Sequence, residues 1–233
     1  MKPICFYIPQ RTGSIRYAAW QLEQWGFDVR PEAGPDITHV LLPIPAGVTP
    51  LPPEVPENAL LFCGGKVDAV QPRIDLLQDE EFLACNAAIT AQCAVALAMD
   101  QLPITLDGCP VLVIGWGRIG KCLAKLLRAL GAAVTVAARS SRDRAMLAAL
   151  GYPAIPIDGI RAEDFRLIVN TVPAPVLGAE VSTDALQMDL ASRPGLLSPQ
   201  AIRARGLPGR VAPESAGALI ASTILRYLEG EGL

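Results

Sequence analysis

The stretch VLVIGWGRIGKCLAKLL, residues 111–127, constrains the fold of this chain more than any other. Residues 111–115 are typical of a buried strand, and the apolar residues after the glycines recur at helical spacing. Between strand and helix lies GWGRIG, which fits the pattern G-x-G-x-x-G. A glycine pattern after a strand and before a helix is typical of a dinucleotide-binding unit.

Each glycine of the pattern has a specific role when a dinucleotide binds. Gly115 permits the tight turn, Gly117 leaves room for a pyrophosphate against the backbone, and Gly120 lets helix and strand pack closely. The N–H groups at the start of the helix then face the phosphates. The residues expected to bind them are Gly115, Gly117, Arg118, Ile119 and Gly120. The alternative is a turn with a purely structural role.

The end of the second predicted strand of this unit indicates which dinucleotide binds. An NAD site carries a carboxylate about 20 residues past the glycines, where it binds the ribose 2′-hydroxyl. Here Ala138 is followed by Arg139, Ser140 and Ser141. A guanidinium and two hydroxyls bind a 2′-phosphate, which a carboxylate would repel. We therefore expect NADP(H), unless Arg139 merely faces solvent.

Strands and helices alternate along the whole chain, which predicts an α/β fold with parallel sheets. The expected strands are 3–8, 38–44, 59–65, 110–115, 133–138, 153–156, 166–170 and 185–190, and the expected helices are 15–27, 79–101, 118–130, 142–150, 198–205 and 213–230. The glycine turn predicts a Rossmann-type doubly wound sheet in the second half. We expect a small α/β domain with a linking helix at 1–101, an NADP-binding Rossmann domain at 102–212, and a last helix at 213–233 that returns to the first domain.

Composition excludes several classes of function. A net charge of −3 and a pI near 5.3 argue against nucleic acid or an anionic membrane as the main partner. The most apolar helical stretch, residues 88–99, is expected to be too short to span a bilayer and contains Gln92. No basic segment precedes an apolar run at the start, so we expect no signal peptide and a cytoplasmic location.

Cysteine and histidine usage argue against a metal centre. The six cysteines show no paired spacing, and four lie in apolar surroundings, which is typical of buried free thiols. The single histidine, His39, makes a zinc site improbable, and we expect it to be structural.

Three later segments carry a more specific signal. They are VNTVPAP (169–175), MDLASRPG (188–195) and GLPGRVAPESAG (206–217). Together with GWGRIG and AARSS, they resemble the A subunit of bacterial dipicolinate synthase, from about Asn86 to the end of the chain. The resemblance implies a small flavodoxin-like domain and a Rossmann domain with a cleft between them, arranged as in formate and glycerate dehydrogenases.

The resemblance also implies an activity. Such a protein is an NADP-dependent dehydrogenase that works with a flavoprotein-like B subunit during sporulation. It acts on a cyclic dicarboxylate and yields pyridine-2,6-dicarboxylate (dipicolinic acid). We also expect a homodimer.

The ends of the predicted strands supply the remaining candidate residues. In open α/β sheets, ligands bind beyond the carboxyl ends of the strands. The residues expected to flank the nicotinamide half are Thr171, Val172, Pro173, Leu190, Ala191 and Ser192. Arg193 is the cation best placed for a substrate carboxylate, although it could instead be a surface residue before Pro194. Asn86 and Thr90 lie four residues apart on one helix face, where they either hydrogen-bond the substrate or cap and pack.

Two other functions remain open at this stage. One is a non-catalytic NADP-binding sensor or partner protein, which Gln92 favours because the family has a glutamate there. The other is a different small-substrate dehydrogenase of the same build. A 2-hydroxy-acid dehydrogenase is disfavoured, because it needs a histidine near the end of the Rossmann domain and none is present there.

Overall fold

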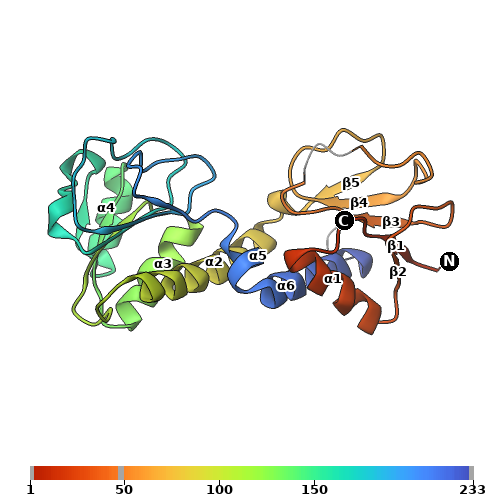
Figure 1. The fold of residues 1–233 in the computed structure, drawn as a ribbon, viewed down its shortest axis with the longest axis horizontal. Helices are drawn as coiled ribbons and strands as arrows, with labels where there is room; N and C mark the ends of the chain where they lie inside the picture. Colours follow the sequence, from red (N-terminus) through yellow and green to blue (C-terminus); the bar gives the residue numbers. More distant parts are fainter. Residues whose placement is uncertain (1–2, 47–49, 231–233) are drawn as a thin grey trace. The chain divides into compact units, whose positions relative to one another are not determined.

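A computed structural model describes residues 3–46 and 50–230 (Figure 1). The chain divides into two compact units, Met1–Asn86 with Pro208–Leu233, and Ala87–Leu207. The helix α2 (Glu80–Gln101) contributes residues to both. The domain boundaries expected from the sequence, 101/102 and 212/213, lie at the end of α2 and just before α6 (Pro213–Leu228), and they stay a prediction.

The second unit contains a parallel sheet whose described part has six strands in the order β11-β10-β9-β6-β7-β8. The strands are β6 (Pro110–Ile114), β7 (Ala133–Ala137), β8 (Ala154–Ile155), β9 (Leu167–Asn170), β10 (Leu186–Asp189) and β11 (Ile202–Arg203), and the helices are α3 (Arg118–Ala129) and α4 (Ser141–Ala149). Counted from β6, this is the 3-2-1-4-5-6 order of a Rossmann fold. The predicted doubly wound sheet is therefore confirmed. Its order reverses between β6 and β9, and the apolar residues of these strands are buried.

The first unit contains a smaller parallel sheet in the order β2-β1-β3-β4-β5. The strands are β1 (Cys5–Tyr7), β2 (Asp28–Arg30), β3 (His39–Leu41), β4 (Leu60–Cys63) and β5 (Arg73–Asp75). This is the flavodoxin-like order 2-1-3-4-5. The helix α1 (Gly13–Gln24) packs against α6, and a Cβ at Gly217 would lie 2.5 Å from the carbonyl oxygen of Ser14. Glycine is therefore required for this close approach.

One predicted helix is wrong. Residues 198–205 contain a turn and the edge strand β11, whose Ile202 and Arg203 pair with β10. The helical pattern of these residues is weak. Backbone pairing with β10 and the ion pair between Arg203 and Asp189 stabilise a strand here instead. Among the described residues, three 3-10 helices (Leu76–Gln78, Ile157–Gly159 and Ala162–Asp164) and the helix α5 (Leu207–Val211) occur in segments for which no helix was predicted.

The apolar helix α2 matches the helix predicted at 79–101. Its 22 residues make it long and apolar enough to cross a membrane by length and composition, so the expectation of too short a span, which considered only residues 88–99, is wrong for the whole helix. Nearly half of its most apolar window is buried within the protein. The core helix of a soluble protein passes the same test, so this single helix is weak evidence for a membrane span.

The cysteines and the histidine lie as expected. All six cysteines are free, and Cys5, Cys63, Cys93 and Cys109 are buried. His39 is half-buried, and its ring lies 5.1 Å from the ring of Phe6. Burial lowers the pKa of His39, which favours the neutral ring of a structural histidine.

Candidate dinucleotide site

The three glycines of the turn between β6 and α3 fulfil three different steric requirements. Gly115 has a φ of +104°, and a Cβ there would lie 2.5 Å from Oγ1 of Thr171. A Cβ at Gly120 would lie 2.2 Å from the carbonyl oxygen of Gly115, so helix and strand touch at this point. A Cβ at Gly117 would meet no atom within 4 Å among the residues described. The first and last of these glycines are needed by the fold, whereas Gly117 leaves open space.

The start of α3 presents backbone donors beside that open space. Gly117 is the N-cap residue, with no side chain to cap the helix, and its carbonyl accepts from the N–H of Lys121. The N–H groups of the first turn have no partner within the helix, because an α-helix leaves its first donors unpaired. Backbone N–H donors at a helix N-terminus favour an anion.

A pocket of about 640 Å³ opens at the carboxyl edge of the sheet, where the strand order reverses. Its lining residues are 115–117, 137–140, 143, 157 and 172–176. They come from the glycine turn, the end of β7 with the start of α4, and the loop after β9. Thr171 joins two of these parts, since its hydroxyl donates to the carbonyl oxygen of Ile114 at 2.9 Å. A pocket at this position is where α/β folds of this order bind dinucleotides.

The end of the pocket at β7 contains one exposed cation and one carboxylate. Arg139 and Ser140 line it, as expected, and Ser140 also caps α4 by accepting from the N–H of Asp143 at 3.4 Å. Arg144 is fixed differently, because its guanidinium donates to the carbonyl oxygens of Ala138 and Arg139 at 2.8 Å. Asp143 also lines the pocket and was missed from the sequence, since it lies beyond the strand end where such a carboxylate is expected. Ser141, the first residue of α4, is exposed.

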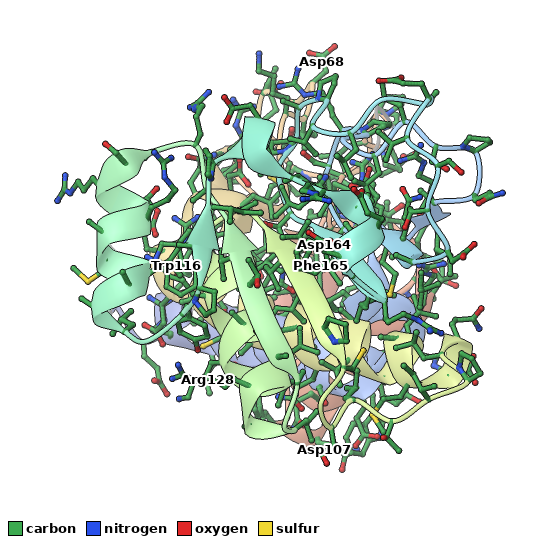
Figure 2. All side chains as sticks on the ribbon, turned by 90° about the vertical axis from the view of Figure 1, so that its left-hand side faces the viewer. Asp68, Asp107, Trp116, Arg128, Asp164 and Phe165 are labelled. Atoms are coloured by element: carbon green, nitrogen blue, oxygen red, sulfur yellow. The ribbon has the colours of Figure 1, made fainter. Side chains whose placement is uncertain are left out.

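Trp116 lines this pocket and also contacts residues outside it. Its ring lies 5.8 Å from that of Tyr152, and the Lys121 ammonium lies 6.0 Å from its centre. Figure 2 shows Trp116 and Arg128 in this part of the second unit. The side chain of Trp116 therefore packs against neighbours of its own unit.

A buried carboxylate organises the loops after β9 and β10. Asp189, 2% exposed, accepts from the side-chain amide of Asn170 at 2.8 Å and pairs with Arg203 at 2.7 Å. It also accepts from the N–H groups of Gly195 and Leu196 at 2.7 and 3.0 Å. Burial raises the pKa of Asp189, but these hydrogen bonds outweigh burial and leave it below its ordinary value. The sequence offered a signal, since Asn170 and Asp189 are polar residues at the ends of apolar strands.

The remaining predicted site residues lie in the loop after β10 and on α2. Leu190, Ala191 and Ser192, expected at the nicotinamide, and Arg193, expected at the substrate, follow β10 directly. The side chain of Arg193 is exposed, and within residues 3–46 and 50–230 it makes no hydrogen bond or ion pair. Asn86 is half-buried and Thr90 is buried, one turn apart on α2. Their roles as substrate contacts stay predictions, as does the role of Pro173, which is exposed at the pocket.

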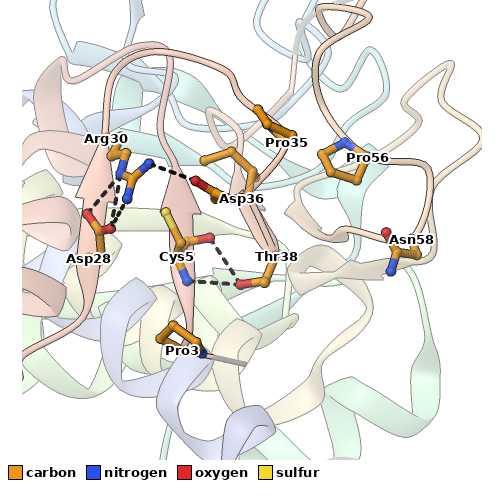
Figure 3. Close-up of a pocket in the computed structure, with 10 residues that line it drawn as sticks. Pro3, Cys5, Asp28, Arg30, Pro35, Asp36, Thr38, Pro56 and Asn58 are labelled. Atoms are coloured by element: carbon orange, nitrogen blue, oxygen red, sulfur yellow. Dashed lines mark hydrogen bonds and ion pairs between the residues drawn. The ribbon is translucent and has the colours of Figure 1, made fainter. Parts of the chain in front are cut away.

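A second pocket, in the first unit, does not resemble an anion or dinucleotide site (Figure 3). It lies at the amino edge of the sheet, where Cys5 and Asp28 begin their strands. Its one arginine, Arg30, is paired with Asp28 at 2.5 Å and with Asp36 at 3.9 Å. Ligands of such sheets bind at the opposite edge.

Comparison with known proteins supports the inference made from the motifs. The chain is 32% identical over 169 residues, 66% of its length, to the A subunit of dipicolinate synthase from Bacillus subtilis (strain 168). The chain is similar to this dipicolinate synthase component. The resemblance predicted from the sequence is thus confirmed, and the match spans 57% of the length of that relative. No protein-family model matches the chain.

Solved structures agree on the fold. The crystal structure of the dipicolinate synthase A subunit from Bacillus halodurans has a TM-score of 0.83 at 22% identity and covers 98% of both chains. L-alanine dehydrogenase has a TM-score of 0.66 at 16% identity, covering 97% of this chain and 80% of that one. These structures share the α/β fold of this chain, including its Rossmann unit.

Proposed function

We propose that the second unit binds NADP(H) and that the chain is a dehydrogenase acting on a cyclic dicarboxylate of the dihydrodipicolinate type. The observation that carries this proposal is the pocket of about 640 Å³ at the glycine turn, with open space at Gly117. In this proposal the backbone N–H groups at the start of α3, where Gly117 is the N-cap residue, bind the phosphates. The similarity to the A subunit of dipicolinate synthase supports the choice of substrate class.

The polar residues after β7 support NADP(H) over NAD(H). Arg139 supplies a guanidinium that makes charge-assisted hydrogen bonds to a 2′-phosphate, and Ser140 and Ser141 supply hydroxyls. Asp143 lines the same pocket, and its negative charge repels a 2′-phosphate. Asp143 lies on the first turn of α4, whose positive end partly offsets its charge.

Arg193 is the proposed anchor for the substrate. A planar guanidinium holds a carboxylate through two parallel hydrogen bonds. Pro194 restricts Arg193 to an extended backbone, which limits the directions in which this side chain points. The cofactor supplies or accepts the hydride, and the chain binds and orients the ring. Asn86 and Thr90 are the proposed hydrogen-bonding contacts for the substrate.

A non-catalytic NADP-binding role is the second candidate. The observation that favours it is Gln92, an exposed amide on α2 at the position of a glutamate in the family. We also propose a flavoprotein-like B subunit and a homodimer as partners, and a cytoplasmic location.

Titration with both cofactors tests the proposed cofactor. NADPH should bind more tightly than NADH by about 10- to 100-fold, the scale of one lost charge-assisted contact. Arg139→Ala should remove most of the difference, and Asp143→Asn should increase it. Equal affinity of the wild type for both cofactors would exclude a 2′-phosphate site, and turnover of a dihydrodipicolinate-type substrate separates the enzyme from the sensor.

A further inference from the structure

The wall of the dinucleotide pocket is held by hydrogen bonds that lead back to Asp189. The wall is the loop after β9, residues 172–176. The N–H groups of Val176 and Leu177 donate to the carbonyl oxygen of Gly195 at 2.8 and 3.2 Å. Gly195 in turn donates its own N–H to Asp189 at 2.7 Å. The pocket wall therefore depends on the loop after β10 (residues 190–196), and that loop depends on a buried carboxylate.

Asn170 connects the same carboxylate to the wall from the other side. Its side-chain amide donates to Asp189 at 2.8 Å and to the carbonyl oxygen of Val172 at 2.9 Å. Its side-chain oxygen accepts from the N–H of Val172 at 3.0 Å. The Asn170 side chain therefore links the backbone of Val172 to the carboxylate of Asp189 through hydrogen bonds.

The loops also make close steric contact. A Cβ at Gly195 would lie 2.3 Å from the side-chain nitrogen of Asn170 and 2.7 Å from the carbonyl oxygen of Val172. Arg203, on the edge strand β11, pairs with this buried carboxylate, while its own side chain is exposed. Asn170, Asp189 and Arg203 come from three neighbouring strands and form one group, here called the Asp189 clamp.

We propose that the Asp189 clamp positions the nicotinamide half of the cofactor by fixing the pocket wall and the loop that carries Arg193. The inference rests on the proposed cofactor site. Asp189 is a positioning residue, because it is buried and acts through backbone groups of the two loops. A misplacement of about 1 Å in a reacting group can cost on the order of a hundredfold in rate, so such positioning bears on function.

Two variants and a matched control isolate the clamp. Asp189→Asn places an NH₂ donor where the carboxylate accepts hydrogen bonds from backbone amides, from Asn170 and from Arg203. Arg203→Met removes the ion pair but leaves the carboxylate. Arg205→Met is the control, because Arg205 is an exposed arginine two residues away with no hydrogen bond or ion pair in the described part of the chain. If Asp189→Asn fails to fold, Arg203→Met still reports on the clamp.

The first readout is amide hydrogen exchange without ligand. Arg203→Met and Asp189→Asn should speed exchange at the amides of Gly195, Leu196 and Val176, while Arg205→Met should not. Unchanged exchange at these amides in both clamp variants would overturn the proposal, whether or not the protein binds a dinucleotide.

The second readout compares NADPH with 2′-phospho-ADP-ribose, which lacks the nicotinamide ring. The clamp variants should weaken the affinity for NADPH by about tenfold and leave the affinity for the nicotinamide-free ligand within about twofold of the wild type. The reason is that only the part of the site that holds the nicotinamide loses its support. Equal weakening of both ligands, as a general loss of structure would give, would overturn the proposal. If the wild type binds neither ligand, the proposed function itself fails. If the wild type binds both ligands but the variants weaken them equally, only the role of the clamp fails.

Discussion

The two units contain parallel sheets of related design, yet the loops at their carboxyl edges differ in what they offer a ligand. In the first unit, a pocket of about 330 Å³ at this edge is lined by Pro9, Pro43, Pro45, Pro50 and Pro52, among others. In the second unit, the pocket at this edge is lined by the glycine turn and by the start of a helix. Proline has no N–H to donate, whereas a glycine turn brings backbone donors close to a ligand.

The loops after the first strand of each sheet show the same contrast. Five residues, 8–12, separate β1 from α1, and among them Arg11 is bound to the carbonyl oxygen of Val29 at 2.9 Å and to Glu23 at 2.8 Å. Only three residues, 115–117, separate β6 from α3. Sheet topology alone therefore does not make a phosphate site; the site also needs a short turn with open space above its backbone.

The largest expected effect is on this glycine turn. Gly117→Val should abolish dinucleotide binding, because the methyl groups would fill the space that the pyrophosphate needs, while a φ of −80° accepts a side chain. Calorimetry with NADPH measures the effect. Gly34→Val is the matched control in the first unit, since a Cβ there also meets no atom within 4 Å. Normal NADPH binding by Gly117→Val would reduce the turn to a structural role.

A smaller effect is expected at the loop that carries Arg193. Arg193→Ala should weaken pyridine-2,6-dicarboxylate by at least about tenfold in the presence of NADPH, the scale of one charged hydrogen bond. It should leave the affinity for NADPH nearly unchanged, because Arg193 does not line the dinucleotide pocket. Calorimetry with both ligands measures this. If Arg193→Ala binds the dicarboxylate as well as the wild type does, Arg193 is a surface residue.

The smallest expected effect is on the acid stability of the two units, each of which contains a buried carboxylate. Asp79 accepts from the N–H of Phe82 at 2.8 Å and pairs with Arg226 of α6, and Asp189 has the partners described above. Burial raises both pKa values, but hydrogen bonds outweigh it, so both lie below the ordinary value of 3.8. Just below pH 3.8 the unfolded chain therefore binds more protons than the folded chain, and stability is lost as pH falls through the folded pKa values.

Urea unfolding between pH 7 and pH 3, followed by hydrogen exchange, measures this loss in each unit. Asp79→Asn should flatten the acid dependence in the first unit and Asp189→Asn in the second. An acid dependence that neither substitution alters would show that other groups control it.

Local patterns in the sequence encode one part of the fold and of the site. The buried strands β6 and β9 are apolar runs, and the glycine turn and the pocket position of Arg139 follow fixed spacings, so these features were predictable from the sequence. The edge strands β2, β5 and β11 are short and partly polar, and only their pairing with a neighbour defines them. The Asp189 clamp joins residues 14 and 19 positions apart through the sheet, so it could not be inferred before β9, β10 and β11 were known to be adjacent.

Amide hydrogen exchange with and without NADPH distinguishes dinucleotide binding by the second unit from binding by the first. With NADPH present, exchange should slow at the amides of residues 115–120, 138–141, 172, 174 and 176 and stay unchanged at the amides of residues 8 and 10–12. Protection at residues 8 and 10–12 with none at 115–120 would contradict binding by the second unit.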